Sequence, residues 1–139
     1  MGKENRKWSK KENEMYDLIT SVILYNSKYS DIEEYISQYF GKSINQKLVF
    51  VDNSEVDKIR EYINDIVGIN NYDIDYIFSG NNLGYGKGNN LAINKYLGQT
   101  KYFLISNLDI KFSIESIEQL IERADIIGQS GVLMPNIYY

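Results

Sequence analysis

The stretch Lys47-Leu48-Val49-Phe50-Val51-Asp52-Asn53-Ser54 decides the fold class, because a short apolar run is followed at once by small polar and acidic residues. Residues 47–51 are rich in β-branched and aromatic side chains and predict a strand. In open α/β sheets, ligands bind beyond the carboxyl ends of the strands. The residues that follow this strand are therefore the first candidates for function.

Short apolar runs and amphipathic segments alternate on both sides of this stretch. The runs predict further strands at Leu18–Tyr25, Ile74–Phe78, Tyr102–Ile105 and Gly131–Met134. Residues at helical spacing predict four helices: from a Ser30 capping box to Gly41, from Val56 to near Gly68, around Leu91–Leu97, and from a Ser113 cap to Ala124. Parallel strands need connections long enough to hold a helix, so the alternation favours a mostly parallel sheet covered on both faces, in the α/β class.

Composition limits the chemistry that the chain can perform. Its 139 residues fit one domain, and they include neither histidine nor cysteine. Imidazole bases, Ser-His-Asp triads, disulfides and thiolate or histidine metal sites are therefore excluded. Any catalysis must use carboxylates, lysine, tyrosine, hydroxyls or a bound metal. The net charge of -4, without a long basic run, argues against nucleic acid as a partner.

The first 17 residues differ from the rest of the chain. Met1–Asp17 is polar and mixed in charge, and we expect a flexible leader before a globular part at residues 18–139. Its basic residues favour contact with an anionic membrane surface, but its acidic residues nearly balance them, so a solvated tail is the preferred interpretation. No stretch approaches the roughly 18 apolar residues of a membrane span. We expect a cytoplasmic location, with peripheral association at the inner face of the membrane as the alternative.

Asp52 has two interpretations. A carboxylate at the carboxyl end of a strand can accept hydrogen bonds from ribose hydroxyls or from a base N–H. Aspartate is also a good helix N-cap, and this position precedes a predicted helix. The residue alone does not decide between them.

The string Asn81-Asn82-Leu83-Gly84-Tyr85-Gly86-Lys87-Gly88-Asn89-Asn90 follows the third predicted strand. Its alternate glycines allow close approach of the backbone to a ligand, and Lys87 offers a cation to an anion. The spacing fits neither the P-loop nor the dinucleotide-binding fingerprint. A structural turn and a nucleotide-binding loop both remain open.

Asn107-Leu108-Asp109 follows the fourth predicted strand. An acidic residue at that edge can hold Mg²⁺ or Mn²⁺ through oxygen, with water and ligand phosphates in the remaining positions. A cap or turn is the alternative for so short a string.

Taken in order, these strings resemble the pattern of glycosyltransferase family 2, including its rhamnosyltransferase-like branch. That pattern has a first strand ending in Tyr-Asn, then Val-Asp-Asn-x-Ser-x-Asp, Asn-x-Gly-x-x-x-Gly-Asn and Asn-x-Asp. The resemblance covers about residues 19–137 and rests on Tyr25-Asn26, Val51 to Ser54 with Asp57, Asn82 to Asn90, and Asn107 to Asp109.

The resemblance implies a GT-A fold and an inverting glycosyltransferase that serves glycan or polysaccharide biosynthesis. The implied donor is a nucleoside-diphosphate sugar (UDP- or dTDP-linked), the acceptor a glycan or a lipid-linked glycan, and the cofactor a divalent cation, Mn²⁺ or Mg²⁺, held by Asp109. The implied nucleotide-binding residues are Tyr25, Asn26, Asp52, Asn82, Gly84, Gly86, Lys87, Gly88, Asn90 and Asn107.

Three departures from the family pattern matter. Asn107 stands where many GT-A enzymes have aspartate, which leaves one carboxylate fewer for a metal, and Glu55 replaces a serine. The family's general base comes from an acceptor-binding half for which we find no counterpart, so we expect a truncated, amino-terminal donor-binding part and assign no catalytic residue. The alternative is a non-catalytic module that binds a nucleotide or a partner. The sequence does not indicate an oligomeric state.

Overall fold

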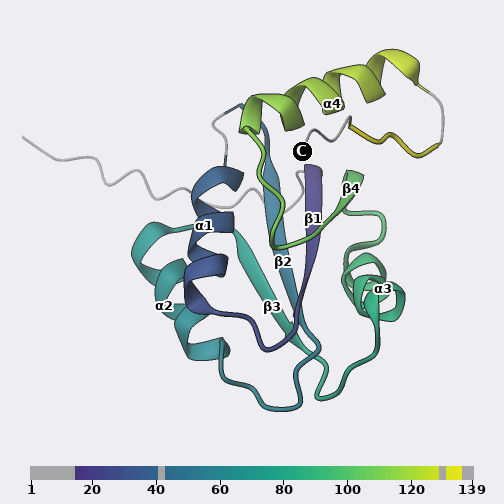
Figure 1. The fold of residues 1–139 in the computed structure, drawn as a ribbon. Helices are drawn as coiled ribbons and strands as arrows, with labels where there is room; N and C mark the ends of the chain where they lie inside the picture. The colour runs from purple at the N-terminus through teal and green to yellow at the C-terminus, as the bar shows by residue number, and fades with distance from the viewer. Residues whose placement is uncertain (1–14, 41–42, 129–130, 136–139) are drawn as a thin grey trace, which may run out of the picture.

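The computed structural model describes residues 15–40, 43–128 and 131–135, which form a parallel sheet covered by helices (Figure 1). The strands are β1 (Tyr16–Leu24), β2 (Gln46–Asp52), β3 (Ile74–Phe78) and β4 (Thr100–Ser106). They lie in the order β3-β2-β1-β4, and each neighbouring pair is parallel. The predicted α/β class is confirmed.

Helices cover both faces of the sheet. They are α1 (Tyr29–Tyr39), α2 (Arg60–Asn70), α3 (Tyr85–Tyr96) and α4 (Ile114–Ile127). In Figure 1, α1 and α2 lie on one face and α3 on the other. None of the helices in the described part of the chain is long and apolar enough to cross a membrane.

The alternation of side chains along β1 and β2 divides the core into two layers. On one face, Val22, Leu24, Leu48 and Phe50 pack against α1 and α2. On the other, Ile19, Val49 and Val51 pack against Ala92 of α3. Because successive residues of a strand point to opposite faces, two strands apolar on both faces hold the helical layers together.

Helix α4 follows the sequence prediction closely. Ser113 is its N-cap, and its side chain accepts a hydrogen bond from the Ser116 N–H at 3.3 Å. Ile117 and Ile121 are buried against Leu18 of β1. Gly128, with φ of +62°, ends the helix in the left-handed conformation that glycine adopts most readily.

Other boundaries differ from the sequence predictions. Tyr16 and Asp17, which we expected in the leader, belong to β1, because their backbone pairs with neighbouring chain at Gln99 and Asn45. The first fourteen residues of the predicted leader lie outside the described residues. The capping box at Ser30 is wrong, because α1 begins at Tyr29 after Lys28, which forms no side-chain cap.

The second helix neither starts nor stops where the sequence suggested. Val56 precedes α2 and is exposed, while the helix runs through Gly68 to Asn70. Ile66 and Val67 pack against the core, and Asn71, with φ of +55°, closes the helix by donating its N–H to the Val67 carbonyl. Asparagine tolerates this left-handed conformation and can replace glycine as the terminator.

The end of the chain also departs from prediction. The fifth strand expected at Gly131–Met134 is wrong, because residues 131–135 form no strand. Val132 and Met134 are largely exposed, so an apolar run that predicts a strand has no sheet neighbour within the described residues.

Candidate functional site

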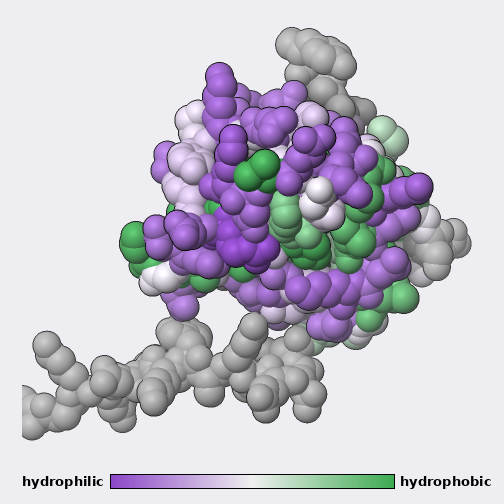
Figure 2. Space-filling model, turned by 90° about the horizontal axis from the view of Figure 1, so that it is seen from below, coloured by the Kyte–Doolittle hydropathy of each residue, from purple (hydrophilic) through white to green (hydrophobic). Residues whose placement is uncertain are grey.

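The order of the strands creates one position at the edge of the sheet where a ligand crevice is expected. The chain runs from β1 through β2 to β3 on one side and then crosses to β4 on the other side of β1. The strand order therefore changes direction at β1 and β4, and in open α/β sheets ligands bind beyond the carboxyl ends of the strands at such a point. The segments that leave these two strands meet on one face of the sheet, where Gln38 of α1 bonds Ile110 and Phe112. Figure 2 views this end of the molecule, where hydrophilic residues surround a patch of hydrophobic surface.

The connection after β1 brings Tyr25 and Asn26 to this edge. Asn26 has φ of +47°, and its N–H donates to Ser54 Oγ at 2.8 Å. This bond ties the loop after β1 to the loop after β2. The Tyr25 side chain is 51% exposed beside it, so its ring is available to a ligand.

Asp52 is not a helix cap, because α2 begins only at Arg60. The residue is 1% exposed, and both carboxylate oxygens have partners: Oδ1 accepts the Ser54 N–H at 2.9 Å and Oδ2 accepts the Tyr76 hydroxyl at 2.6 Å. Each carboxylate oxygen keeps a second lone pair. A ligand that uses Asp52 must reach those lone pairs in a buried site.

Tyr76 is a member of the site that the sequence analysis missed. Its hydroxyl also lies 3.1 Å from Asp57 Oδ1, and Arg60 stacks over its ring while Arg60 Nε donates to Asp57 Oδ2 at 2.7 Å. Burial by itself raises the pKa of Asp57, but hydrogen bonds from Arg60 and Tyr76 outweigh it and hold that pKa below its usual value. Tyr76 thus links the first and last acids of the Asp52–Asp57 string.

The glycine-rich string is half loop and half helix. Asn82 Oδ1 accepts the Gly84 N–H at 3.0 Å, and Gly84, with φ of +79°, is the N-cap of α3. The left-handed conformation at Gly84 explains a glycine there. Gly86, Lys87 and Asn90 are exposed, and the first turn of α3 contains no acidic residue. A helix N-terminus with an adjacent lysine attracts an anion.

Gly88 and Asn89 serve packing between α3 and the sheet. A Cβ on Gly88 would lie 2.8 Å from Ile23 Cδ1 and 2.9 Å from Asn53 Nδ2. Asn89 is buried, accepts the Ser21 hydroxyl at 2.7 Å and donates to the Tyr85 carbonyl at 2.9 Å. The last glycine of the string therefore has a structural reason that does not involve a ligand.

Asn53 joins the second and third strings and was not a predicted site residue. Its side chain is buried, donates to the Gly84 carbonyl at 3.1 Å and accepts the Ser79 hydroxyl at 3.1 Å. It fixes the N-cap of α3 relative to the end of β2. Its place directly after an apolar strand is the signal that could have found it.

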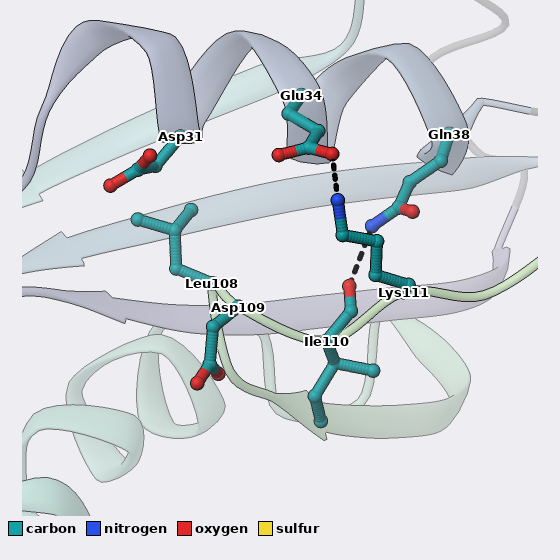
Figure 3. A pocket seen from close by; sticks show the side chains of 7 residues that line it. All are labelled: Asp31, Glu34, Gln38, Leu108, Asp109, Ile110 and Lys111. Carbon is teal, nitrogen blue, oxygen red and sulfur yellow. Dashed lines mark hydrogen bonds and ion pairs between the residues drawn. The ribbon is translucent and has the colours of Figure 1, made fainter. Parts of the chain in front are cut away.

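Asn107, Leu108, Asp109 and Ile110 form a tight turn after β4. The Ile110 N–H donates to the Asn107 carbonyl at 3.3 Å, so Asp109 occupies the third position of the turn. Asparagine is favoured at the first position of such turns. Figure 3 shows Leu108 directed toward α1 and the Asp109 carboxylate directed away from Glu34 and Gln38.

Asp109 is exposed, and no hydrogen bond or ion pair to it is found among the described residues. Within the same residues, no group of three acidic side chains could hold a metal ion by itself. An unpaired carboxylate fits a hard cation that takes its other oxygens from water and from a diphosphate. Of the predicted binding residues, Asp109 and Asn107 lie at the β4 side of the crevice and Tyr25 and Asn26 at the β1 side.

A shallow cavity of about 240 Å³ lies next to this turn (Figure 3). It is formed between α1 and the segment after β4 and is lined by Asp31, Glu34, Gln38, Leu108, Asp109, Ile110 and Lys111. Lys111 pairs with Glu34 across it. Sequence reasoning did not identify this cavity, because its two walls are more than seventy residues apart in the chain.

Known proteins are similar to this chain in sequence and in fold. The low-salt glycan biosynthesis hexosyltransferase Agl10 of Haloferax volcanii is 30% identical over 113 residues, which are 80% of this chain and 34% of Agl10. The chain thus spans about a third of the length of that relative. The crystal structure of S. aureus TarS superposes with a TM-score of 0.61 at 20% identity, covering 79% of this chain and 20% of TarS.

A second structure, of residues 1–349 of S. aureus TarS, gives a TM-score of 0.58 at 19% identity over 85% of this chain and 38% of that one. At such identity these structures speak for the fold alone, and they confirm the predicted GT-A fold. The sequence profile of glycosyl transferase family 2 matches residues 21–139. The chain therefore belongs to glycosyl transferase family 2.

Proposed function

We propose that this chain binds a nucleoside-diphosphate sugar together with Mn²⁺ or Mg²⁺ and forms the donor side of an inverting glycosyltransferase of glycan biosynthesis. The observation that carries the proposal is the exposed carboxylate of Asp109, which has no partner among the described residues and lies on a turn at the strand switch point. Membership of the family and the similarity to a hexosyltransferase support the same class of reaction.

The diphosphate has two complementary features at this edge. The N-terminus of α3 presents free backbone N–H groups and the exposed Lys87, and its first turn has no carboxylate to repel an anion. Asp109 would hold the divalent cation. When bound, the cation neutralises charge on the departing diphosphate.

The nucleoside would lie toward β1 and β2. The exposed ring of Tyr25 offers a surface for stacking, and Asp52 offers its remaining lone pairs to a base N–H or a ribose hydroxyl. In the inverting reaction, the bond between the anomeric carbon and the diphosphate oxygen breaks as the acceptor oxygen attacks from the opposite face. We assign the base that takes the acceptor's proton to no residue of this chain.

The test is the melting temperature of the chain with UDP or dTDP, with and without Mn²⁺. A ligand at one hundred times its Kd stabilises the folded protein by about 2.7 kcal/mol. We expect Asp109→Ala to remove the Mn²⁺-dependent part of this rise. Asp65→Ala, at an exposed position of α2, is the matched control and should keep it. No rise for wild type with either nucleotide across Mn²⁺ and Mg²⁺ would refute the proposal.

A non-catalytic nucleotide-binding module is the second candidate, because the features described here concern binding and fit it equally well. The two candidates agree on binding and differ in turnover. Release of free sugar or formation of a glycoside from the donor supports the enzyme. Binding that depends on Asp109, without either product, supports the module.

A further inference from the structure

We propose that Gln38 of α1 is a positioning residue for metal-dependent nucleotide binding, because its side-chain amide clamps the turn that presents Asp109. The inference rests on the proposed function and adds to it a residue outside the four motif strings. Its basis is a pair of hydrogen bonds between one side chain and the main chain beyond the turn.

The amide of Gln38 uses both its donor and its acceptor on the same segment. Nε2 donates to the Ile110 carbonyl at 2.7 Å, and Oε1 accepts the Phe112 N–H at 3.3 Å. In a parallel sheet, one residue of a strand bonds in the same way to its neighbour: it donates to the carbonyl of one residue and accepts the N–H of the residue two positions later. The Gln38 side chain thus replaces a strand partner for residues 110–112, and Figure 3 shows its bond to the Ile110 carbonyl.

The clamp holds one end of a turn whose other end is already fixed. Ser106, the last residue of β4, is buried and paired with Val22 of β1. The Ile110 N–H closes the turn on Asn107, and the Ile110 carbonyl is held by Gln38. Asp109 therefore lies between two anchored points.

Other contacts also cross this seam. Lys111 pairs with Glu34, but both side chains are more than half exposed, and such pairs contribute little to order. Phe112 packs edge-on against Tyr35 with ring centroids 5.5 Å apart, which fixes the chain beyond the turn. The Gln38 clamp acts on the residue that follows Asp109, and Leu108, which precedes Asp109, packs against the core.

Holding the turn lowers the cost of binding a cation. A single carboxylate contributes to affinity only if its position is already set, because ordering the backbone at the moment of binding reduces the gain. Loss of the two Gln38 bonds frees the Ile110 carbonyl and the Phe112 N–H without touching Asp109. We expect the Mn²⁺ concentration needed for half-maximal effect to rise about tenfold, as two neutral hydrogen bonds would give.

The experiment uses Gln38→Met, which has a similar length and no hydrogen bond to the turn. The melting temperature is followed against Mn²⁺ at fixed UDP or dTDP, and hydrogen exchange of the Phe112 amide is measured without ligand. Ser37→Ala is the control, since among the described residues its hydroxyl bonds only the Glu34 carbonyl of the same helix. We expect Gln38→Met to raise the half-maximal Mn²⁺ concentration about tenfold and to expose the Phe112 amide, and Ser37→Ala to do neither.

A purely structural role gives a different pattern. It would lower the melting temperature of Gln38→Met without ligand and leave the half-maximal Mn²⁺ concentration unchanged, and that result overturns the inference. Gln38→Ala removes the same bonds with different packing, so it must show the same change in Mn²⁺ concentration. If wild type shows no Mn²⁺-dependent rise, the proposed function fails and this inference fails with it. A wild-type rise that Gln38→Met shows at the same half-maximal Mn²⁺ concentration defeats the inference alone.

Discussion

Replacing Gly88 by alanine tests the packing of α3 against the sheet. The new Cβ would lie 2.8 Å from Ile23 Cδ1 and 2.9 Å from Asn53 Nδ2, and Cβ atoms in proteins essentially never come this close to another heavy atom. The end of Ile23 can rotate away. Asn53 cannot move as cheaply, because it is buried and bonded to the Gly84 carbonyl and to the Ser79 hydroxyl.

The same substitution at Gly86 provides the reference. Gly86 lies in the same helix, and nothing stands within 4 Å of a Cβ built there. Alanine favours a helix over glycine by about 1 kcal/mol in both variants. The difference in the free energy of unfolding between Gly86→Ala and Gly88→Ala therefore isolates the steric effect, which overpacking places at about 1–3 kcal/mol.

The assay is urea unfolding of both variants, followed by circular dichroism at 25 °C. We expect Gly86→Ala to be as stable as wild type or more stable, and Gly88→Ala to be less stable than Gly86→Ala by about 1–3 kcal/mol with the same dependence on urea. Equal stability of the two variants would refute the reasoning. It would mean that Ile23 and Asn53 yield without loss and that Gly88 is not required by packing.

Two further predictions concern the carboxylates. Tyr76→Phe keeps the ring but removes the hydroxyl that bonds buried Asp52, so we expect the free energy of unfolding in urea to fall by about 1–3 kcal/mol. Tyr72→Phe is the control, because its hydroxyl has no bond among the described residues, and it should be as stable as wild type. Equal losses of stability in the two variants would contradict the assignment. Burial raises the pKa of Asp75, but hydrogen bonds from Lys95 and Tyr96 outweigh it and lower that pKa below its usual value. Its contribution to stability is therefore complete above the unfolded pKa of about 4 and is lost as the pH falls through the folded value. Asp75→Asn should be less stable at pH 7 and lose less stability than wild type between pH 5 and pH 2.5, and an unchanged acid profile would argue against these bonds.

Much of the sheet could be predicted because its signals are local. The apolar runs of β2 and β3 and the cap at Ser113 each lie within a few residues, and the structure reproduces them with small shifts. The capping box at Ser30 failed because Lys28 has the extended backbone of an N-cap and Tyr29 and Ser30 are already helical, so the helix starts without a side-chain cap. The start of α3 inside the glycine string could not be predicted from propensity, since glycine disfavours helices and tertiary contacts of Gly88 and Asn89 decide instead.

The sequence alone could point to the motif strings of the candidate site, but it could not point to the residues that hold those strings in position. The string Asn107 to Asp109 can be recognised in the sequence because polar residues directly follow an apolar strand. Gln38 carries no such signal, because it lies on a helix and its partners are 72 and 74 residues away. In the sequence, Tyr76 looks like an ordinary aromatic residue of a strand, and only the fold shows that its hydroxyl bonds Asp52.

The structure also gives different environments to Asp52 and Asp109, two acids at the ends of strands. Asp52 is buried, and both its oxygens are bonded to Ser54 and Tyr76, so displacing the tyrosine would cost about 1.5–3 kcal/mol, the value of a hydrogen bond to a charged group. Asp109 is exposed and has no partner among the described residues, so under the proposed function it would give up only water on binding a cation. A ligand that uses only the remaining lone pairs of Asp52 must enter a buried site, whereas one that also brought a metal to Asp109 would engage an exposed carboxylate without breaking a bond within the described part of the protein. The affinity of the edge should therefore reside mainly on the diphosphate side of the crevice, between α3 and β4, with the β2 side contributing selectivity for the nucleoside.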